Sequence, residues 1–365
     1  MYATKPLSLF KSHPEAVSRP PPEGPNSGYL VVKGDEDGDA DETCCWGQCG
    51  GTRVRDLPFP QDRVLTLRYT QRRRHGQRRS SGGTTYTDSV VFVPVPDQPV
   101  ASNRYYAVVA AGKHKGLIRA CSREEDMTQC CFCRCVNDAK PRPFDPADVY
   151  QQIEIVQRRR GRFTARAIAA DGFPGFLYRK KYWRVYASKT SSGHLDLGDA
   201  PGLNAALRSG QLADASLLAL APMSNTVGKW YCPFYLIKED GVSPSEQMDR
   251  GAFYEVVLEQ LWEPVHGCSR VLIGGSLEAR PSHAERHGDG FVWFRAAAGQ
   301  SVGVCASVWE RMRWEEYRGG WVDGEAGKVA GRSMLVERFV VKRMDDGSVV
   351  VAFDFVHLNK VKLPC

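Results

Sequence analysis

Short apolar segments, each bounded by residues that break regular structure, constrain this chain more than any other feature. The segments are rich in valine, tyrosine, phenylalanine and isoleucine, and glycine, proline, aspartate or asparagine stands at their ends. This pattern is typical of β-strands, because β-branched and aromatic side chains suit a pleated, half-buried surface. The segments predicted as strands are 28–32, 63–70, 89–95, 104–110, 117–122, 152–157, 163–169, 181–186, 230–238, 253–259, 291–295, 335–343 and 348–355.

Two connections between predicted strands have the composition of tight hairpins. The Asp-Asp-Gly turn at 345–347 closes a C-terminal hairpin over Leu335–Phe355, and Arg160-Gly161 closes another. Glycine supplies the left-handed backbone conformation that such turns require. Phe339 and Val341 alternate with other residues along the C-terminal hairpin, so we expect this hairpin to be an integral part of the fold.

Helical patterns are scarce. Between 302 and 317, Val304, Val308 and Met312 recur four residues apart, which predicts one amphipathic helix packed on a sheet. An Ala- and Leu-rich stretch at 199–220 is interrupted by proline and glycine, which predicts one or two short helices.

With 365 residues, the chain is long enough for about two domains. We predict an all-β or β-dominated α+β protein with two sandwich-like halves and few short helices. The proline-rich segment Pro14–Pro25 is predicted to be extended rather than helical. The predicted organisation is an extended lead-in at 1–27, an N-terminal β-rich half at 28–190, a partly helical linker at 191–225, and a C-terminal β-rich half at 226–365.

The two halves share an order of aromatic segments. The first half starts such segments at Arg104, Tyr150 and Asp171, and the second half starts them at Lys229, Phe253 and Asp289. An internal duplication and a chance recurrence in a strand-rich chain both explain this order.

The net charge of +7 comes from two arginine-rich runs. Five arginines lie within 72–79 and four within 158–162, and without these nine the chain has 40 basic residues against 42 acidic ones. Six acidic residues within 35–42 form a separate run that lacks the spacing of a calcium-binding EF-hand. Because a nucleic-acid-binding domain usually carries its charge across a whole face, nucleic acid is not the expected partner, and any such contact is predicted through the arginine-rich loops only.

The beginning of the sequence lacks the apolar core of a secretory signal, and no apolar run approaches the length of a spanning helix. We therefore expect a cytoplasmic or nuclear protein without a membrane partner. In such a reducing compartment the default state of cysteine is the free thiol.

Several strings are too specific to come from composition. They include MYATKPLSLF, CCWGQCGG, VFVPVPDQPVASNRYYAV, FDPADVYQQIEI, VGKWYCPFY and VERFVVKRMDDGSVVVAFDF. On these strings the chain resembles a land-plant family catalogued only as a domain of unknown function, from residue 1 to about 357. The resemblance implies a plant origin and one full-length unit, and it implies no known activity, cofactor or catalytic residue.

Cysteines form the most conspicuous candidate site. Cys131, Cys133 and Cys135 share one face if their segment is a strand, and Cys121 precedes them by nine or more residues. Neighbours on one strand face lie about 7 Å apart, so only a bent loop brings three thiolates to one zinc ion. Buried apolar cysteines are the favoured interpretation, and a structural zinc site or a redox-sensitive thiol cluster remains an alternative.

Three other motifs each have a structural and a functional interpretation. His283 and His287 have a helical zinc-ligand spacing, but the surrounding proline and glycines favour a loop. The Gly112–Gly116 segment is a candidate phosphate cradle, although a hairpin turn is favoured. The aromatic residues within 259–263 and 309–314 are expected in the core rather than in a ligand cage.

No phosphate-binding loop, serine-hydrolase elbow, kinase motif or dinucleotide fingerprint occurs in the sequence. We therefore favour a non-enzymatic interaction or regulatory protein with a protein partner and no cofactor. Two alternatives stay open: a metal- or redox-sensing protein that uses the Cys121–Cys135 region, with zinc as its only candidate cofactor, and an enzyme of unrecognised type.

Overall fold

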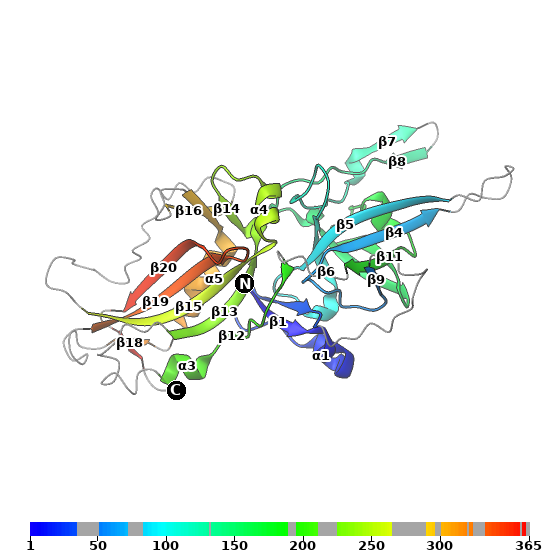
Figure 1. The fold of residues 1–365 in the computed structure, drawn as a ribbon. Helices are drawn as coiled ribbons and strands as arrows, with labels where there is room; N and C mark the ends of the chain where they lie inside the picture. The colour runs from blue at the N-terminus through cyan, green and yellow to red at the C-terminus, as the bar shows by residue number, and fades with distance from the viewer. Residues whose placement is uncertain are drawn as a thin grey trace.

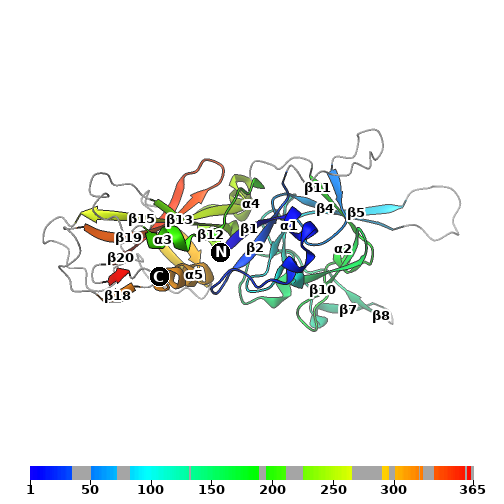
Figure 2. The ribbon, with the colours of Figure 1, turned by 90° about the horizontal axis from the view of Figure 1, so that it is seen from below.

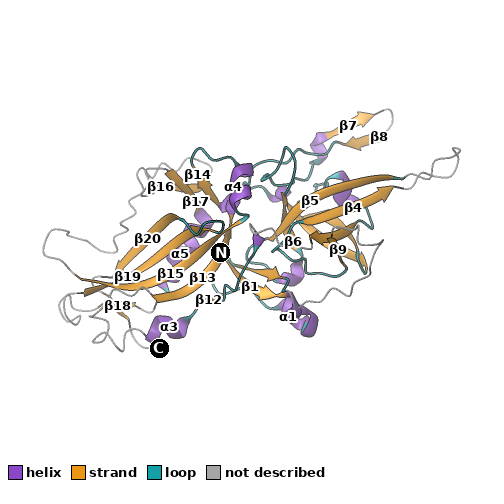
Figure 3. Cartoon of the chain, viewed as in Figure 1, coloured by secondary structure: helices purple, strands orange, loops and turns teal. Residues whose placement is uncertain are grey.

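The computed structural model describes residues 1–34, 51–71, 83–130, 133–188, 195–210, 225–264, 290–295, 301–319, 321–323, 333–357 and 360–362. About 45% of the described residues lie in strands and about 20% in helices. The predicted β-dominated fold with few short helices is therefore confirmed (Figure 3).

Two large sheets lie side by side and define two lobes (Figure 1). The sheet of the C-terminal lobe has the order β2 (Gly28–Val32), β1 (Tyr2–Pro6), β13 (Asn225–Pro233), β15 (Phe253–Pro264), β19 (Ser333–Arg343) and β20 (Val349–His357), with β12 (Gly202–Leu203) paired to β13. Strands β1 and β2 are parallel, and the other pairs in this sheet are antiparallel. Strands from the first 32 residues thus complete a sheet that is built mostly from residues beyond 224.

A second layer covers this sheet. It consists of β14 (Ile237–Glu239), β17 (Ser301–Cys305) and β16 (Phe291–Arg295), followed by helix α5 (Ala306–Tyr317). The rings of Phe294 and Phe353 meet edge to face between the layers, with centroids 4.7 Å apart. Face-to-face packing of two sheets gives this lobe a sandwich-like core.

The sheet of the N-terminal lobe has the order β10 (Arg162–Ala167), β9 (Gln152–Arg159), β6 (Arg104–Val109), β5 (Thr84–Pro94), β4 (Leu65–Gln71), β11 (Arg184–Ser188) and β3 (Gly51–Val54). An isolated antiparallel bridge joins Phe163 of the edge strand β10 to Trp183, the residue before β11. Phe59 lies at the centre of the core of this lobe and contacts the rings of Phe92 and Phe163. Burial of such rings is the main stabilising contribution in this lobe.

Strand β5 joins the cores of the two lobes. Val90 and Phe92 face the core of the N-terminal lobe, whereas Val91 and Val93 face a core that continues into the C-terminal lobe. All four are almost completely buried, which explains why this strand is apolar without interruption rather than alternating.

The remaining elements are short. The α-helices are α1 (Leu7–Ser12), α2 (Phe176–Arg179), α3 (Ala205–Gly210) and α4 (Pro244–Arg250), and the 3-10 helices are Pro14–Ser18, Val100–Ser102, Glu124–Asp126, Val149–Gln151 and Phe234–Leu236. Two strand pairs complete the fold: β7 (Met127–Cys130) with β8 (Cys133–Val136), and β18 (Trp321–Asp323) with β21 (Lys360–Lys362). The β7–β8 hairpin projects from the N-terminal lobe in both views (Figures 1 and 2).

Both predicted hairpins are present. Gly347 and Gly161 adopt positive φ angles of 68° and 67° at the turns, and Phe339 lies opposite Phe353 in the C-terminal pair. A register shift next to Val341 leaves Val349 exposed, although the alternation places it on the apolar face.

Three local predictions are wrong. Residues 117–122 form isolated bridges instead of a strand, because Ile118 pairs singly with Val108 of β6 and with Arg142, and Ser122 pairs singly with Phe173. The predicted helix at 302–317 starts only at Ala306, since Val302 and Val304 pair with β14 and β16 as part of β17.

The N-terminal lead-in is also not extended throughout. Tyr2–Pro6 is a strand, and Pro14–Ser18 is a 3-10 helix in which proline occupies the first position, where its missing N–H is tolerated. The division of the chain into 28–190, 191–225 and 226–365 stays a prediction as a statement about separate domains.

The possible internal duplication receives mixed evidence. Strands β6 and β9 pair with each other, as do β13 and β15, which matches the first two shared segments. The third segments differ, because Asp171–Phe176 leads into helix α2 whereas Phe291 begins strand β16.

Candidate functional site

A cavity of about 200 Å³ opens in the N-terminal lobe between strand β5, helix α2 and the loop that contains Asp138. Its volume equals about seven waters at about 30 Å³ each, so it holds one side chain or a ligand of similar size. We call this cavity the β5–α2 pocket.

One wall of the β5–α2 pocket is a polar triad. Arg119 donates to one carboxylate oxygen of Asp88 at 2.7 Å, and the Tyr178 hydroxyl donates to the other at 3.0 Å. Asp88 comes from β5, Arg119 follows the Ile118 bridge, and Tyr178 belongs to α2. The Arg119 Nε atom is buried and has no hydrogen-bond partner. This N–H is therefore unsatisfied within the protein.

The protonation states of the triad follow from burial and charge. Burial raises the pKa of Tyr178 well above its usual value, and the Asp88 carboxylate adds to this shift. Burial alone would lower the pKa of Arg119, but its contacts with Tyr178 and Asp88 outweigh burial and raise the pKa. At neutral pH, Tyr178 is a neutral donor and Arg119 is a cation.

A second carboxylate lines the pocket. Asp138 accepts a hydrogen bond from Arg179 at 2.7 Å and another from the backbone N–H of Phe176 at 2.8 Å. These bonds attach the Asp138 loop to the first turn of α2. Both pocket carboxylates are thus already paired with an arginine.

The mouth of the pocket is aromatic. Tyr86 is 38% exposed, and its ring lies 4.9 Å from that of Phe176. The Lys180 ammonium stands 4.1 Å from the centroid of the Phe176 ring, and Arg179 lies 5.7 Å from it. Cations of the chain itself therefore already contact this aromatic surface.

Cys121 lines the pocket as a buried thiol. Burial raises its pKa to about 12, and the charge of Asp148 acts in the same direction. Because the thiolate is the nucleophile and the metal ligand, Cys121 has neither property at neutral pH.

The predicted cysteine site is only partly within the described residues. Cys131 lies outside them, Cys133 belongs to β8, and Cys135 is exposed on the same strand. Within the described part of the chain, no three His, Cys, Asp or Glu residues are placed to share a metal ion. The zinc and redox hypotheses for Cys131, Cys133 and Cys135 stay predictions.

Other predicted motifs also fall outside the description. They are His283 and His287, the acidic run at 35–42 and the arginine run at 72–79. In the second arginine run, Arg160 forms an exposed ion pair with Asp56 at 3.4 Å.

The Gly112–Gly116 segment is a turn against the C-terminal lobe. Lys115 forms an ion pair with Asp249 of α4, and a Cβ on Gly116 would lie 2.4 Å from the Pro244 carbonyl oxygen. The favoured turn interpretation is confirmed, because Lys115 contacts the other lobe. Trp309, from the second aromatic motif, packs on Phe294 and Phe353 in the core as predicted.

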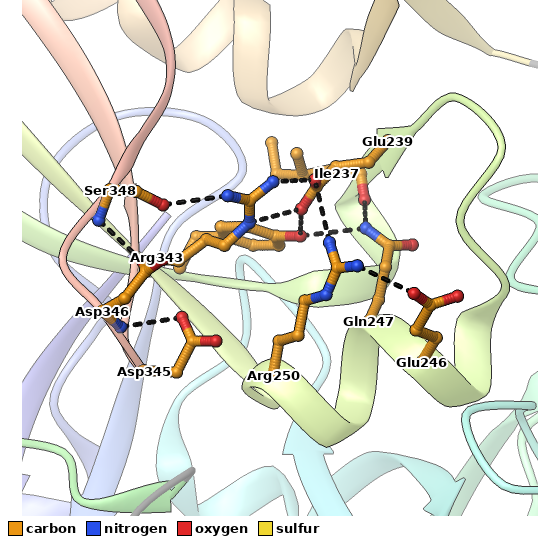
Figure 4. A network of polar contacts seen from close by, with 10 residues as sticks. Ile237, Glu239, Glu246, Gln247, Arg250, Arg343, Asp345, Asp346 and Ser348 are labelled. Carbon is orange, nitrogen blue, oxygen red and sulfur yellow. Dashed lines mark hydrogen bonds and ion pairs between the residues drawn. The ribbon is translucent and has the colours of Figure 1, made fainter. Parts of the chain in front are cut away.

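A second polar cluster lies in the C-terminal lobe (Figure 4). Glu239 of β14 accepts hydrogen bonds from Arg343 and Tyr254, the latter at 2.6 Å, and forms an ion pair with Arg250 at 3.6 Å. Gln247 of α4 donates to the Ile237 carbonyl and to Tyr254. The Glu239 carboxylate is 3% exposed. The hydrogen bonds and ion pairs of this cluster connect β14, α4, β15 and β19, so its role is to stabilise their packing.

Comparisons with known proteins give a family only for part of the chain. A family described as "Protein of unknown function (DUF1262)" matches residues 23–132. This match supports the predicted resemblance in that segment, whereas the full-length resemblance and the plant origin stay expectations. None of the curated proteins matches the sequence. Among solved structures, a crystal structure of Cry35Ab1 matches at 8% identity with a TM-score of 0.38, covering 82% of this chain and 88% of that one.

Sequence reasoning did not find the β5–α2 pocket. Asp88, Arg119 and Tyr178 are far apart along the chain and form no motif, so only the fold brings them together. Within the described residues, no helix has both the length and the apolar character needed to cross a bilayer.

Proposed function

We propose that this chain is a non-enzymatic interaction protein and that the β5–α2 pocket receives an uncharged polar side chain of a partner protein. One observation carries the proposal. The pocket is lined by two carboxylates and one guanidinium group, and Arg179 pairs with Asp138 from outside the lining, so each carboxylate already has a cationic partner.

The pairing determines which ligand the pocket favours. A cationic group would compete with Arg119 and Arg179 for the carboxylates, and an anionic group would meet Asp88 and Asp138. A neutral amide or hydroxyl avoids both costs, and it can donate to the remaining acceptor positions of the two carboxylates. The exposed ring of Tyr86 provides apolar contact at the mouth.

The described cysteines Cys121, Cys135, Cys232 and Cys305 are free thiols, which supports the proposed location in the cytoplasm or nucleus. An enzymatic function has less support, because the Cys121 thiol is not activated. Redox sensing has one observation in its favour, the exposed thiol of Cys135 on the projecting β7–β8 hairpin.

An NMR titration of the full chain with capped amino acids tests the proposal. Acetyl-glutaminamide is expected to shift the backbone resonance of Phe176, whereas acetyl-lysinamide and acetyl-glutamate amide are expected to bind at least about tenfold more weakly. Tyr86→Ala is expected to weaken the response, and Tyr317→Ala, which removes an exposed ring elsewhere, is the control. Equal binding of a charged probe, or no response at Phe176 to any probe, contradicts the proposal.

A further inference from the structure

Three arginines form a row across the outer face of the N-terminal sheet. Arg184 at the start of β11 lies directly opposite Arg68 of β4. Trp183, the residue before β11, forms an antiparallel bridge with Phe163 of β10. In an antiparallel pair the residue after Trp183 lies opposite the residue before Phe163, so Arg184 lies opposite Arg162. Phe163 and Trp183 are fully buried in the core, whereas Arg162 and Arg184 are half-buried and Arg68 is exposed.

This arrangement has an electrostatic cost within the chain itself. Adjacent strands lie about 4.8 Å apart, so the row places the backbones of three arginines within about 10 Å. Like charges directly opposite each other on a sheet are destabilising. In the described part of the chain, none of the three arginines forms an ion pair with a carboxylate. The row is a cationic surface that lacks its own counter-charge.

Two tyrosines flank the row. The Arg68 guanidinium lies 4.9 Å from the centroid of the Tyr186 ring, and that of Arg162 lies 5.7 Å from the centroid of Tyr182. Tyr182 is 45% exposed and has a φ of 74°, a conformation that a residue of this type rarely adopts. Such strain persists only where the surrounding structure enforces it, and it often occurs at functional positions. Here it holds an aromatic ring at the edge of the cationic row.

We propose that this face binds single-stranded nucleic acid, with Arg68, Arg162 and Arg184 on successive phosphates and the Tyr182 ring as a surface for base stacking. A positively charged track with exposed aromatic rings is the usual combination for binding single strands without sequence preference. An anionic polymer without bases would use the arginines alone, so the exposed tyrosine favours nucleic acid over a sulfated polysaccharide. Arg162 belongs to the second arginine run of the sequence, one of the two loops to which any nucleic-acid contact was assigned from the sequence.

Fluorescence anisotropy with a labelled twelve-nucleotide oligouridine tests the proposal on the full chain. For single strands, each phosphate contact contributes about 0.7 to the slope of log affinity against log salt concentration. The double variant Arg68→Gln/Arg184→Gln is expected to bind at least about tenfold more weakly at low salt, with a slope reduced by about 1.4. Arg166→Gln, which removes one exposed arginine paired with Glu154, is the control for loss of positive charge outside the row and is expected to leave the slope nearly unchanged.

The role of the aromatic ring needs a separate variant. Tyr182→Gly removes the ring and relieves the positive φ, so it is expected to weaken binding while leaving the salt slope unchanged. If the glutamine variant does not fold, Arg68→Lys/Arg184→Lys keeps the charges and is expected to retain the slope. An unchanged affinity in Arg68→Gln/Arg184→Gln overturns the proposal. Equal binding of a heparin oligosaccharide that Tyr182→Gly does not alter also overturns it, because the face then recognises charge alone.

Discussion

Replacement of Glu239 by glutamine is expected to destabilise the C-terminal lobe strongly. The carboxylate is 3% exposed and is contacted by Arg343, Arg250 and the Tyr254 hydroxyl. Glutamine keeps the shape but removes the charge, which leaves two guanidinium groups without their buried counter-charge. Removal of one partner from a buried ion pair typically costs about 3–5 kcal/mol. This is a large fraction of a domain stability of about 5–15 kcal/mol.

The measurement is urea unfolding of both proteins at pH 7, with Glu246→Gln as the matched control. Glu246 pairs with the same Arg250 from the surface of α4, where its carboxylate is 52% exposed. An exposed pair of this kind contributes about 0.3–0.5 kcal/mol. The midpoint urea concentration of the control is therefore expected to be close to that of the unmodified chain, whereas that of Glu239→Gln is clearly lower.

The pH dependence provides a second check. Burial raises the pKa of Glu239, but hydrogen bonds from Arg343 and Tyr254 outweigh burial and lower the pKa below its usual value of 4.5. A carboxyl group with a lowered pKa stabilises the folded state fully above its unfolded pKa, and this stabilisation is lost as pH falls through the folded pKa. The difference in free energy of unfolding between the unmodified chain and Glu239→Gln should thus be constant from pH 6 to 8 and shrink below about pH 4.5. A difference below about 1 kcal/mol at pH 7, or one that persists unchanged in acid, would refute the reasoning.

Three further predictions concern other parts of the fold. Gly116→Ala should lower the thermal midpoint more than Gly112→Ala, because both positions have positive φ but only Gly116 meets the Pro244 carbonyl; equal effects would contradict the interlobe contact. A chain that ends at Arg332 should be insoluble or protease-sensitive, because it loses the fully buried Phe339 and Phe353, and a soluble, cooperatively melting product would contradict the sheet assignment. Iodoacetamide at pH 8 should label Cys135 but not Cys121 in the native protein, as peptide mass spectrometry would show, because burial raises the pKa of Cys121 to about 12; rapid labelling of Cys121 would contradict its burial.

Sequence patterns predicted best the strands that have a clear apolar character and a turn-forming residue at a boundary. Gly28–Val32 and Phe291–Arg295 have the predicted bounds, and a glycine stands at or just before the start of each. Strands β1 and β3 were missed, since their short segments become strands only through pairing with distant partners, and the predicted strand 230–238 joined the end of β13 to β14. The polar triad of the β5–α2 pocket was unpredictable for the same reason, because Asp88, Arg119 and Tyr178 meet only in the folded sheet.

The position of β1 inside the C-terminal sheet has a consequence for biosynthesis. Tyr2 lies between Gly28 on one side and Tyr231 on the other, and Ala200 donates a hydrogen bond to Thr4, 196 residues away. On the ribosome, β1 and β2 emerge long before β13, so this part of the sheet has to wait for most of the chain to be made. Contacts of such high sequence separation form slowly, and the apolar side chains of Tyr2 and Leu30 stay exposed during the delay. The newly made N-terminal segment therefore stays without its β13 partner until most of the chain has left the ribosome.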